Sequence, residues 1–235
     1  MKIRNLILSA LLLGAFVSAP AFAGPVIDWD PAYVYGPGAS TTVALTGAEL
    51  KGVGIVSMFD GPLGFLDAND PTKEYTFVFR GLIAQPTIIS GIPAFTFYTT
   101  NYSGGIIELY EGSPRNSSFA PNPENAIVPS TFQDGTLLLS GIFTSFYTQT
   151  NNFTQSKSGN MEGTILWSGG TLLPLFNGGN GQPCPGLFTG GITWSTEPGV
   201  GIPGYVFRHD GKIDLNCPTP SAPSTWGQMK ARYRD

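Results

Sequence analysis

Apolar and polar residues alternate with a period of two through much of this chain. In the segment that begins at Glu74, the rings of Tyr75, Phe77 and Phe79 share one face, as they do in a strand with one side against a core. Turn residues separate such segments from one another. The alternation predicts strands at residues 41–45, 49–59, 74–82, 94–100, 105–111, 135–148, 161–168, 191–196 and 205–215.

Two of these segments carry finer signals. Residues 135–148 are apolar on both faces, which we interpret as a β-bulge at Ser140-Gly141 that switches the phase of the strand. The alternative is a central strand that is covered on both sides. Asp210-Gly211 predicts a two-residue hairpin turn that divides residues 205–215 into two short strands.

The spacing of these strands predicts an all-β fold. We expect an antiparallel β-sandwich or jelly-roll-like domain of about nine or more strands, with a related barrel as the alternative. Composition points the same way, because 31 Gly and 20 Pro supply turns, 16 Phe and 9 Tyr favour strands, and 12% of the residues are charged.

Residues 1–23 have a different pattern. Lys2 and Arg4 precede an apolar run, and Ala21-Phe22-Ala23 follows it, which is typical of a cleaved signal peptide. We therefore expect a mature chain, exported to the periplasm, the cell surface or the extracellular space. A buried N-terminal helix is the alternative. No later apolar stretch approaches the roughly 18 residues of a bilayer span, so we expect no transmembrane segment in the mature chain.

The mature chain divides into three parts by composition. We expect a single β-sandwich domain at residues 24–217, a Pro/Ser linker at 218–224 and a short basic-aromatic tail at 225–235. Loss of Lys2 and Arg4 leaves 10 basic and 16 acidic residues in the mature chain, a net charge of −6. The tail has a net charge of +2, so the rest of the mature chain, its body, has a net charge of −8. An acidic body repels phosphate backbones. Nucleic acid is therefore not an expected partner, whereas glycans, cations, an envelope partner and self-association remain.

Both cysteines, Cys184 and Cys217, lie in the mature chain. In an oxidising compartment an even number of cysteines usually pairs, and we predict a disulfide that stabilises the fold by roughly 3–4 kcal/mol. The alternative is a catalytic or metal-bound thiol. Such a thiol needs partner side chains, and a chain with a single histidine offers few of them.

The C-terminal tail combines apolar and basic residues. A short helix capped at Ser224 or Thr225 places the two kinds on separate faces, Trp226, Met229 and Tyr233 on one and Lys230, Arg232 and Arg234 on the other. One hypothesis is a docking or sorting peptide for an export machine or an anionic surface. The alternative is a frayed terminus.

A cluster of oxygen-bearing side chains suggests a calcium site. Calcium requires several oxygen ligands close together, and the candidates are Asp60, Asp67, Asn69, Asp70 and Glu74. Asp67 and Asn69 have the spacing of the start of an EF-hand loop, but Pro71 breaks that motif. Solvated acids in turns are the alternative interpretation. No other cofactor is expected.

Enzyme signatures are weak. The chain has no nucleophile elbow and no phosphate-binding or dinucleotide glycine motif. We interpret His209 as a partly buried strand histidine, because it shares the parity of Tyr205 and Phe207; a general base is the alternative. Glycoside hydrolysis needs only two carboxylates, but the odd spacing of Glu108 and Glu111 puts them on opposite faces of a strand. Glu108 with Glu162 is the alternative pair.

Aromatic rings offer a second kind of site. Exposed Trp and Tyr rings can stack on sugar faces, and the candidates are Trp29, Trp167, Trp194, Tyr98, Tyr102 and Tyr110. The alternative is that these rings belong to the core, as most aromatic rings of a sheet protein do. A coplanar row of exposed rings on one sheet face would favour glycan binding.

The leader, residues 132–141 (Phe-Gln-Asp-Gly-Thr-Leu-Leu-Leu-Ser-Gly) and residues 226–234 resemble those of uncharacterised exported β-rich proteins of bacteria. The resemblance implies an exported β-rich fold and transfers no catalytic or binding residue. We expect a non-enzymatic structural, adhesive or interaction protein of the cell envelope or extracellular space, in which edge strands allow assembly by strand addition. A carbohydrate- or other ligand-binding module is the alternative, and a cofactor-free glycoside hydrolase is a distant third.

Overall fold

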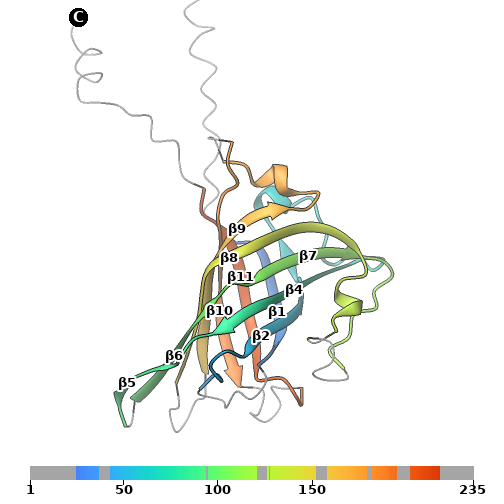
Figure 1. Ribbon diagram of the computed structural model, residues 1–235. Coiled ribbons are helices and arrows are strands. Elements are labelled where there is room, and N and C mark those ends of the chain that lie inside the picture. The colour runs from blue at the N-terminus through green and yellow to red at the C-terminus, as the bar shows by residue number, and fades with distance from the viewer. Residues whose placement is uncertain are drawn as a thin grey trace, which may run out of the picture.

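The fold is all-β and antiparallel, which confirms the predicted class (Figure 1). The computed structural model describes residues 25–36, 43–93, 95–120, 126, 128–151, 158–178, 181–194 and 202–217. Its 11-stranded sheet consists of β1 (Pro25–Tyr35), β2 (Glu49–Ile55), β3 (Met58–Phe59), β4 (Glu74–Ala84), β5 (Ile88–Ile92), β6 (Phe95–Ser103), β7 (Ile106–Gly112), β8 (Thr136–Asn151), β9 (Ser158–Gly169), β10 (Gly186–Trp194) and β11 (Phe207–Leu215). Three short 3₁₀ turns are η2 (Gly61–Leu63), η3 (Ser130–Phe132) and η4 (Leu173–Phe176).

Eight strands close into a barrel in the order β1-β11-β10-β9-β8-β7-β4-β2, and β2 pairs again with β1. The predicted sandwich is therefore corrected to a single sheet that returns on itself. The strand that turns an open sheet into a barrel is β2, because it pairs with both β4 and β1 and so leaves neither of them as an edge. Periodicity shows which residues face a core, but it does not show which strands pair, so a sandwich and a barrel give the same sequence pattern.

Most of the predicted strands form, with three corrections. Residues 205–215 contain one uninterrupted strand, β11, so the predicted turn at Asp210-Gly211 is wrong; Gly211 instead lies opposite Gly190 of β10. Residues 43–45 are not in a strand. The prediction missed β1, which Pro31 interrupts in sequence, and β5, which is short and contains Gly91.

The switch of phase in β8 occurs four residues later than predicted. Leu139 and Phe143 are buried on one parity and Phe146 on the other, and the extra residue against β9 is Thr144. At Ser140-Gly141 there is also an irregularity, as predicted, but there the extra residue belongs to β9.

Three strands bend together along a line of glycines. Gly81 of β4 and the link Gly104-Gly105 between β6 and β7 all have positive φ, at 75°, 73° and 99°, a conformation that favours glycine. Gly81 donates its backbone N–H to the Glu49 carboxylate at 2.7 Å. Thr144 of β8 lies at the same level. At this line β4, β8 and the line formed by β7 and β6 all switch the parity of their buried side chains.

Beyond the bend, β6 continues the line of β7. Tyr102 pairs with Phe146 and Ile106 with Ile142, so the two strands keep one register along β8. The last strand pair between β4 and β6 is Ala84 with Tyr102, and β6 then pairs with β5 in place of β4. The β5–β6 hairpin therefore extends past the end of the barrel, at the lower left of Figure 1.

Side chains fill the barrel interior. Phe188 lies at its centre, with its ring 5.1 Å from Trp29 and 5.7 Å from Phe146. On β2 the inward positions are Gly52 and Gly54, where a Cβ would lie 2.2 Å and 2.3 Å from the rings of Phe79 and Phe77. These glycines therefore make room for two large rings of the neighbouring strand.

A second apolar cluster covers the outside of part of the barrel. It consists of Tyr33, Val53, Val78, Ala126, Phe132 and Tyr205. Thr76 anchors it by donating its hydroxyl to the Phe132 carbonyl at 2.9 Å. As a result, β4 is buried on both faces at its centre.

The predicted disulfide Cys184–Cys217 is present at one end of the barrel, where it links the residues just before β10 to those just after its neighbour β11. The Cys184 N–H donates to the Phe176 carbonyl of η4 at 2.6 Å, so the bridge holds η4 against the start of β10. This end is opposite to the β5–β6 hairpin (Figure 1). A disulfide points to an oxidising, extracytoplasmic location. In the described part of the chain, no helix has the length and apolar character needed to cross a membrane.

Candidate functional site

The candidate calcium ligands are engaged in their own turns. Asp60 accepts the Gly61 N–H at 2.7 Å, Asp67 the Asn69 N–H at 2.9 Å and Asp70 the Thr72 N–H at 2.8 Å. The Thr72 hydroxyl and N–H hold the pKa of Asp70 below its ordinary value. Among the described residues, no three His, Cys, Asp or Glu side chains come together in a group that could hold a metal ion. Calcium binding stays a prediction that these positions do not support.

Glu74 differs from the other candidates because it is buried. Its carboxylate accepts the backbone N–H groups of Asn116 and Ser117, both at 3.0 Å. A buried carboxylate requires such donors. Glu74 therefore fastens the segment after β7 to the start of β4.

Four of the six candidate stacking rings belong to the core. Trp29, Trp167, Trp194 and Tyr102 are at most 8% exposed and offer no open face to a sugar. Tyr98 and Tyr110 are partly exposed, but the switch of parity at the bend puts them on opposite faces of the sheet. The coplanar row of rings that would favour glycan binding is not found among the described residues.

The carboxylates considered for hydrolysis lie apart. Glu108 forms an ion pair with Arg80 at 2.9 Å and accepts the Gln133 amide at 3.0 Å. Glu108 lies opposite Ser140, which lies opposite Gly169, whereas Glu162 is roughly 23 Å away along β9 at about 3.3 Å per residue. Glycosidase carboxylates lie no more than about 10 Å apart. Glu111 pairs separately with Lys73 at 3.0 Å.

His209 is a core residue, as its strand parity indicated. Its ring stacks on Phe188 with centroids 5.2 Å apart, and its Nδ1 accepts the Trp29 indole N–H at 3.2 Å. Nε2 faces the backbone of Gly190 and makes no hydrogen bond of good geometry. Burial lowers the pKa of His209 to about 3. The ring is therefore neutral at physiological pH, and in the interior it cannot reach a substrate.

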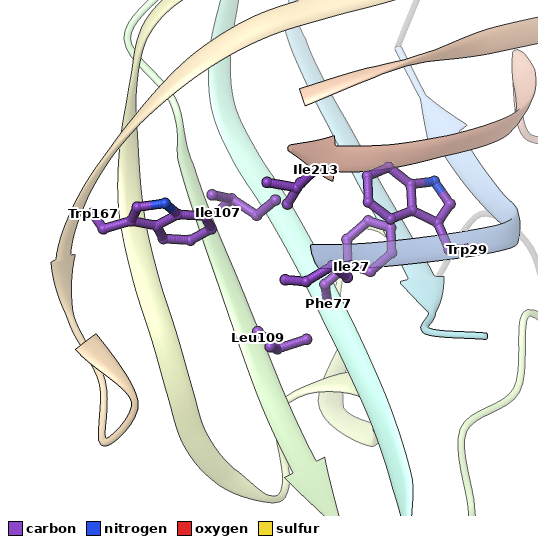
Figure 2. Close-up of a pocket in the computed structure, with 7 residues that line it drawn as sticks. All are labelled: Ile27, Trp29, Phe77, Ile107, Leu109, Trp167 and Ile213. Atoms are coloured by element: carbon purple, nitrogen blue, oxygen red, sulfur yellow. The ribbon is translucent and has the colours of Figure 1, made fainter. Parts of the chain in front are cut away.

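A small cavity lies among the inward side chains of the barrel. Figure 2 shows its lining side chains, which are Ile27, Trp29, Phe77, Ile107, Leu109, Trp167 and Ile213. They converge from strands on different sides of the barrel and leave about 10 Å³, the room of about one water molecule. This cavity is too small for a sugar or another organic ligand.

The β5–β6 hairpin is the strongest candidate for a functional surface. The exposed fractions of Ile88, Ile89, Ile92 and Phe95 are 57%, 62%, 61% and 57%, and all five residues of β5 are exposed. Exposed apolar residues that stand singly need no explanation, but a cluster of them marks an interaction site.

The register places most of this cluster on one face. Ile92 pairs directly with Phe95, and Ser90 with Phe97, and directly paired residues share a face of the sheet. Ile88 is four residues from Ile92 along β5, so it lies on the same face as Ile92, whereas Ile89 lies on the other face. We call the outer face of the hairpin formed by Ile88, Ile92, Phe95 and Phe97 the hairpin patch.

One edge of the hairpin is open. Among the described residues, β5 pairs only with β6, and it ends the order of strands in the sheet. Open edges are usually protected by charges or bulges, yet residues 81–107 contain no Asp, Glu, Lys, Arg or His. This charge-free stretch is the feature of the sequence that could have indicated an exposed hairpin. Periodicity alone does not distinguish the hairpin from core strands.

The tail residues Trp226, Met229, Lys230, Arg232, Tyr233 and Arg234 lie outside the described residues, as do the leader and the linker. Their predicted roles stay predictions.

Comparison with known proteins adds no assignment. The chain matches no family model, and no curated protein or solved structure is significantly similar to it.

Proposed function

We propose that this chain is an exported, non-enzymatic structural or interaction protein of the cell envelope or extracellular space, and that the β5–β6 hairpin is its contact surface. The leader pattern of residues 1–23 and the disulfide support export. The barrel acts as a base, with the disulfide between β10 and β11 at one end, that presents the hairpin at the other end.

The observation that carries this proposal is the exposure of the hairpin patch. Among the described residues, most large rings are packed inside the barrel or in the outer cluster, and Gly52 and Gly54 of β2 leave room for two of them. Between Ile88 and Phe95, by contrast, apolar side chains face solvent on an open strand. Burying this surface against a partner removes apolar area from water and satisfies the backbone groups of the open edge.

Neither alternative gains a comparable observation. For glycan binding, four of the six candidate rings are buried, and the cavity holds about one water molecule. For hydrolysis, the considered carboxylates are too far apart or paired with cations.

The proposal is tested by sedimentation of the purified, exported chain with envelope fractions of the organism that produces it. We expect the variant Ile88→Ser/Ile92→Ser/Phe95→Ser to lose at least roughly 10-fold in the bound fraction, because about 1.4 kcal/mol of contact energy suffices for that factor. The matched control is Phe65→Ser/Leu175→Ser, which removes two apolar side chains of 65% and 44% exposure outside the hairpin. Equal binding by the hairpin variant and the wild type would contradict the proposal.

A further inference from the structure

We infer that the occupant of the open edge is β5 of a second copy of this chain, in an antiparallel pair centred on Ser90. This inference rests on the proposed function and names its partner. It follows from three properties of the hairpin: the open backbone edge, the lack of charge and the equal spacing of Ile88 and Ile92 from Ser90.

The open edge favours a strand over a lipid surface. An exposed strand edge carries unpaired N–H and C=O groups, and such groups are not tolerated in the hydrocarbon region of a bilayer without partners. A second strand satisfies these groups and covers the apolar side chains at once. The hairpin therefore fits an extended segment of protein.

The charge pattern selects an uncharged apolar strand. With no Asp, Glu, Lys, Arg or His between residues 81 and 107, the edge offers no charged partner to a charged peptide. A copy of the same edge is equally uncharged, so the two meet without like-charge repulsion at the contact, although the bodies of the chains are acidic. Salt that screens the bodies should then strengthen the association.

The pair is self-complementary on the outer face of β5, whereas on the other face Ile89 lies opposite Gly91 of the second copy. A two-fold axis at Ser90 places Ile88 opposite Ile92 of the second copy and Ile92 opposite its Ile88, which is the requirement of an isologous interface. The hairpin patches of both copies then lie side by side on one face of a continuous sheet. The contact is small, so we expect a weak dimer that forms at high concentration.

Cysteine cross-linking tests the register. Residues directly opposite in an antiparallel pair have Cα atoms about 4.5–5.5 Å apart, within the range that a disulfide spans. Under mild oxidation we expect Ser90→Cys to give a covalent dimer on its own, and an equimolar mixture of Ile88→Cys and Ile92→Cys to give a mixed dimer. The control is Ile88→Cys alone, whose two Cα atoms lie roughly 13 Å apart in this register and should cross-link at least roughly 10-fold more slowly.

The inference is overturned if Ser90→Cys stays monomeric at the highest attainable concentration, or if Ile88→Cys alone cross-links as fast as Ser90→Cys. It is also overturned if the wild type is a monomer that sediments with phosphatidylcholine vesicles, which would make lipid the partner. All three sites are exposed, so circular dichroism should be unchanged. If the triple serine variant loses envelope binding while Ser90→Cys does not cross-link, the dimer is wrong and the proposed function stands.

Discussion

At the scale of single residues, the barrel depends on where small and aromatic side chains meet. Gly52 and Gly54 lie under the rings of Phe79 and Phe77, and His209 lies between Trp29 and Phe188. Interiors are packed closely enough that a change of one methylene is felt. Each of these positions therefore yields a prediction about stability.

Filling the space of an inward glycine should destabilise the fold. In Gly54→Val the new Cβ would lie 2.3 Å from the Phe77 ring and 2.8 Å from Ala32, and we expect a loss of about 1–3 kcal/mol in the free energy of unfolding. The control is Gly191→Ala in β10, where nothing lies within 4 Å of the added Cβ and the change should stay within about 0.5 kcal/mol. Urea denaturation measures both. Equal free energies of unfolding for the two variants would show that Gly54 does not lie in tight contact with the Phe77 ring.

His209 predicts an acid-sensitive stability. Its pKa is about 3 in the folded state and 6.5 ordinarily, so the unfolded chain binds the extra proton between these values and stability is lost as pH falls below 6.5. The slope should approach about 1.4 kcal/mol per pH unit. His209→Gln, compared with the wild type between pH 6.5 and 5, should flatten the curve in that window, above most carboxylate pKa values. An unchanged slope in the variant would contradict the account of His209.

At the scale of elements, the glycine bend and the disulfide shape the two ends of the barrel. The bend at Gly81 and Gly104-Gly105 redirects β4, β6 and β8 together, and β6 carries the hairpin past the barrel. At the opposite end the disulfide links β10 to β11. One end therefore carries a covalent link between neighbouring strands, and the other carries the protruding hairpin.

Removing the disulfide should lower stability without changing the topology. Cys184 and Cys217 are 33 residues apart, and freeing this loop in the unfolded chain costs about 3–4 kcal/mol, a drop of roughly 10 °C in Tm for a chain of this size. Thermal unfolding of Cys184→Ser/Cys217→Ser measures it. As a control, a reductant should lower the Tm of the wild type and leave the double variant unaffected. A double variant with the Tm of the oxidised wild type would refute this role.

The elements also show what the sequence could and could not reveal. The alternation in β4 and the cysteine pair were predictable, because both depend on local composition. The closure of the barrel was not, since β2 reads as an ordinary strand whichever neighbours it has. The extended conformation of Asp210-Gly211 could not be predicted either. This pair resembles a turn in sequence, but pairing with β10 on one side and β1 on the other holds it in β11.

The same reasoning applies to the candidate site. Trp29 and Trp167 could not be told from sugar-stacking rings by sequence, because a strand presents its side chains to either face equally and only the fold decides which face is inside. The exposure of the β5–β6 hairpin could not be predicted from the sequence either, because its residues look like core residues. Ile88 and Phe95 have the composition of core residues, and their exposure follows from the bend that carries β5 beyond the barrel.

At the scale of the whole molecule, the protein is a filled barrel with an open strand at one end. The cavity beside Trp29 and Trp167 has room for about one water molecule, whereas the hairpin offers backbone and apolar groups to a partner. The central claim is that this hairpin drives association.

Sedimentation velocity of the purified, disulfide-bonded chain over a range of concentrations tests that claim most directly, with Ile88→Ser/Ile92→Ser/Phe95→Ser and Phe65→Ser/Leu175→Ser measured alongside. The account predicts that the wild type and the Phe65/Leu175 variant shift toward twice the monomer mass as concentration rises, more so at higher salt, while the hairpin variant stays monomeric. A wild type that is monomeric throughout, or a hairpin variant that associates as the wild type does, would contradict it.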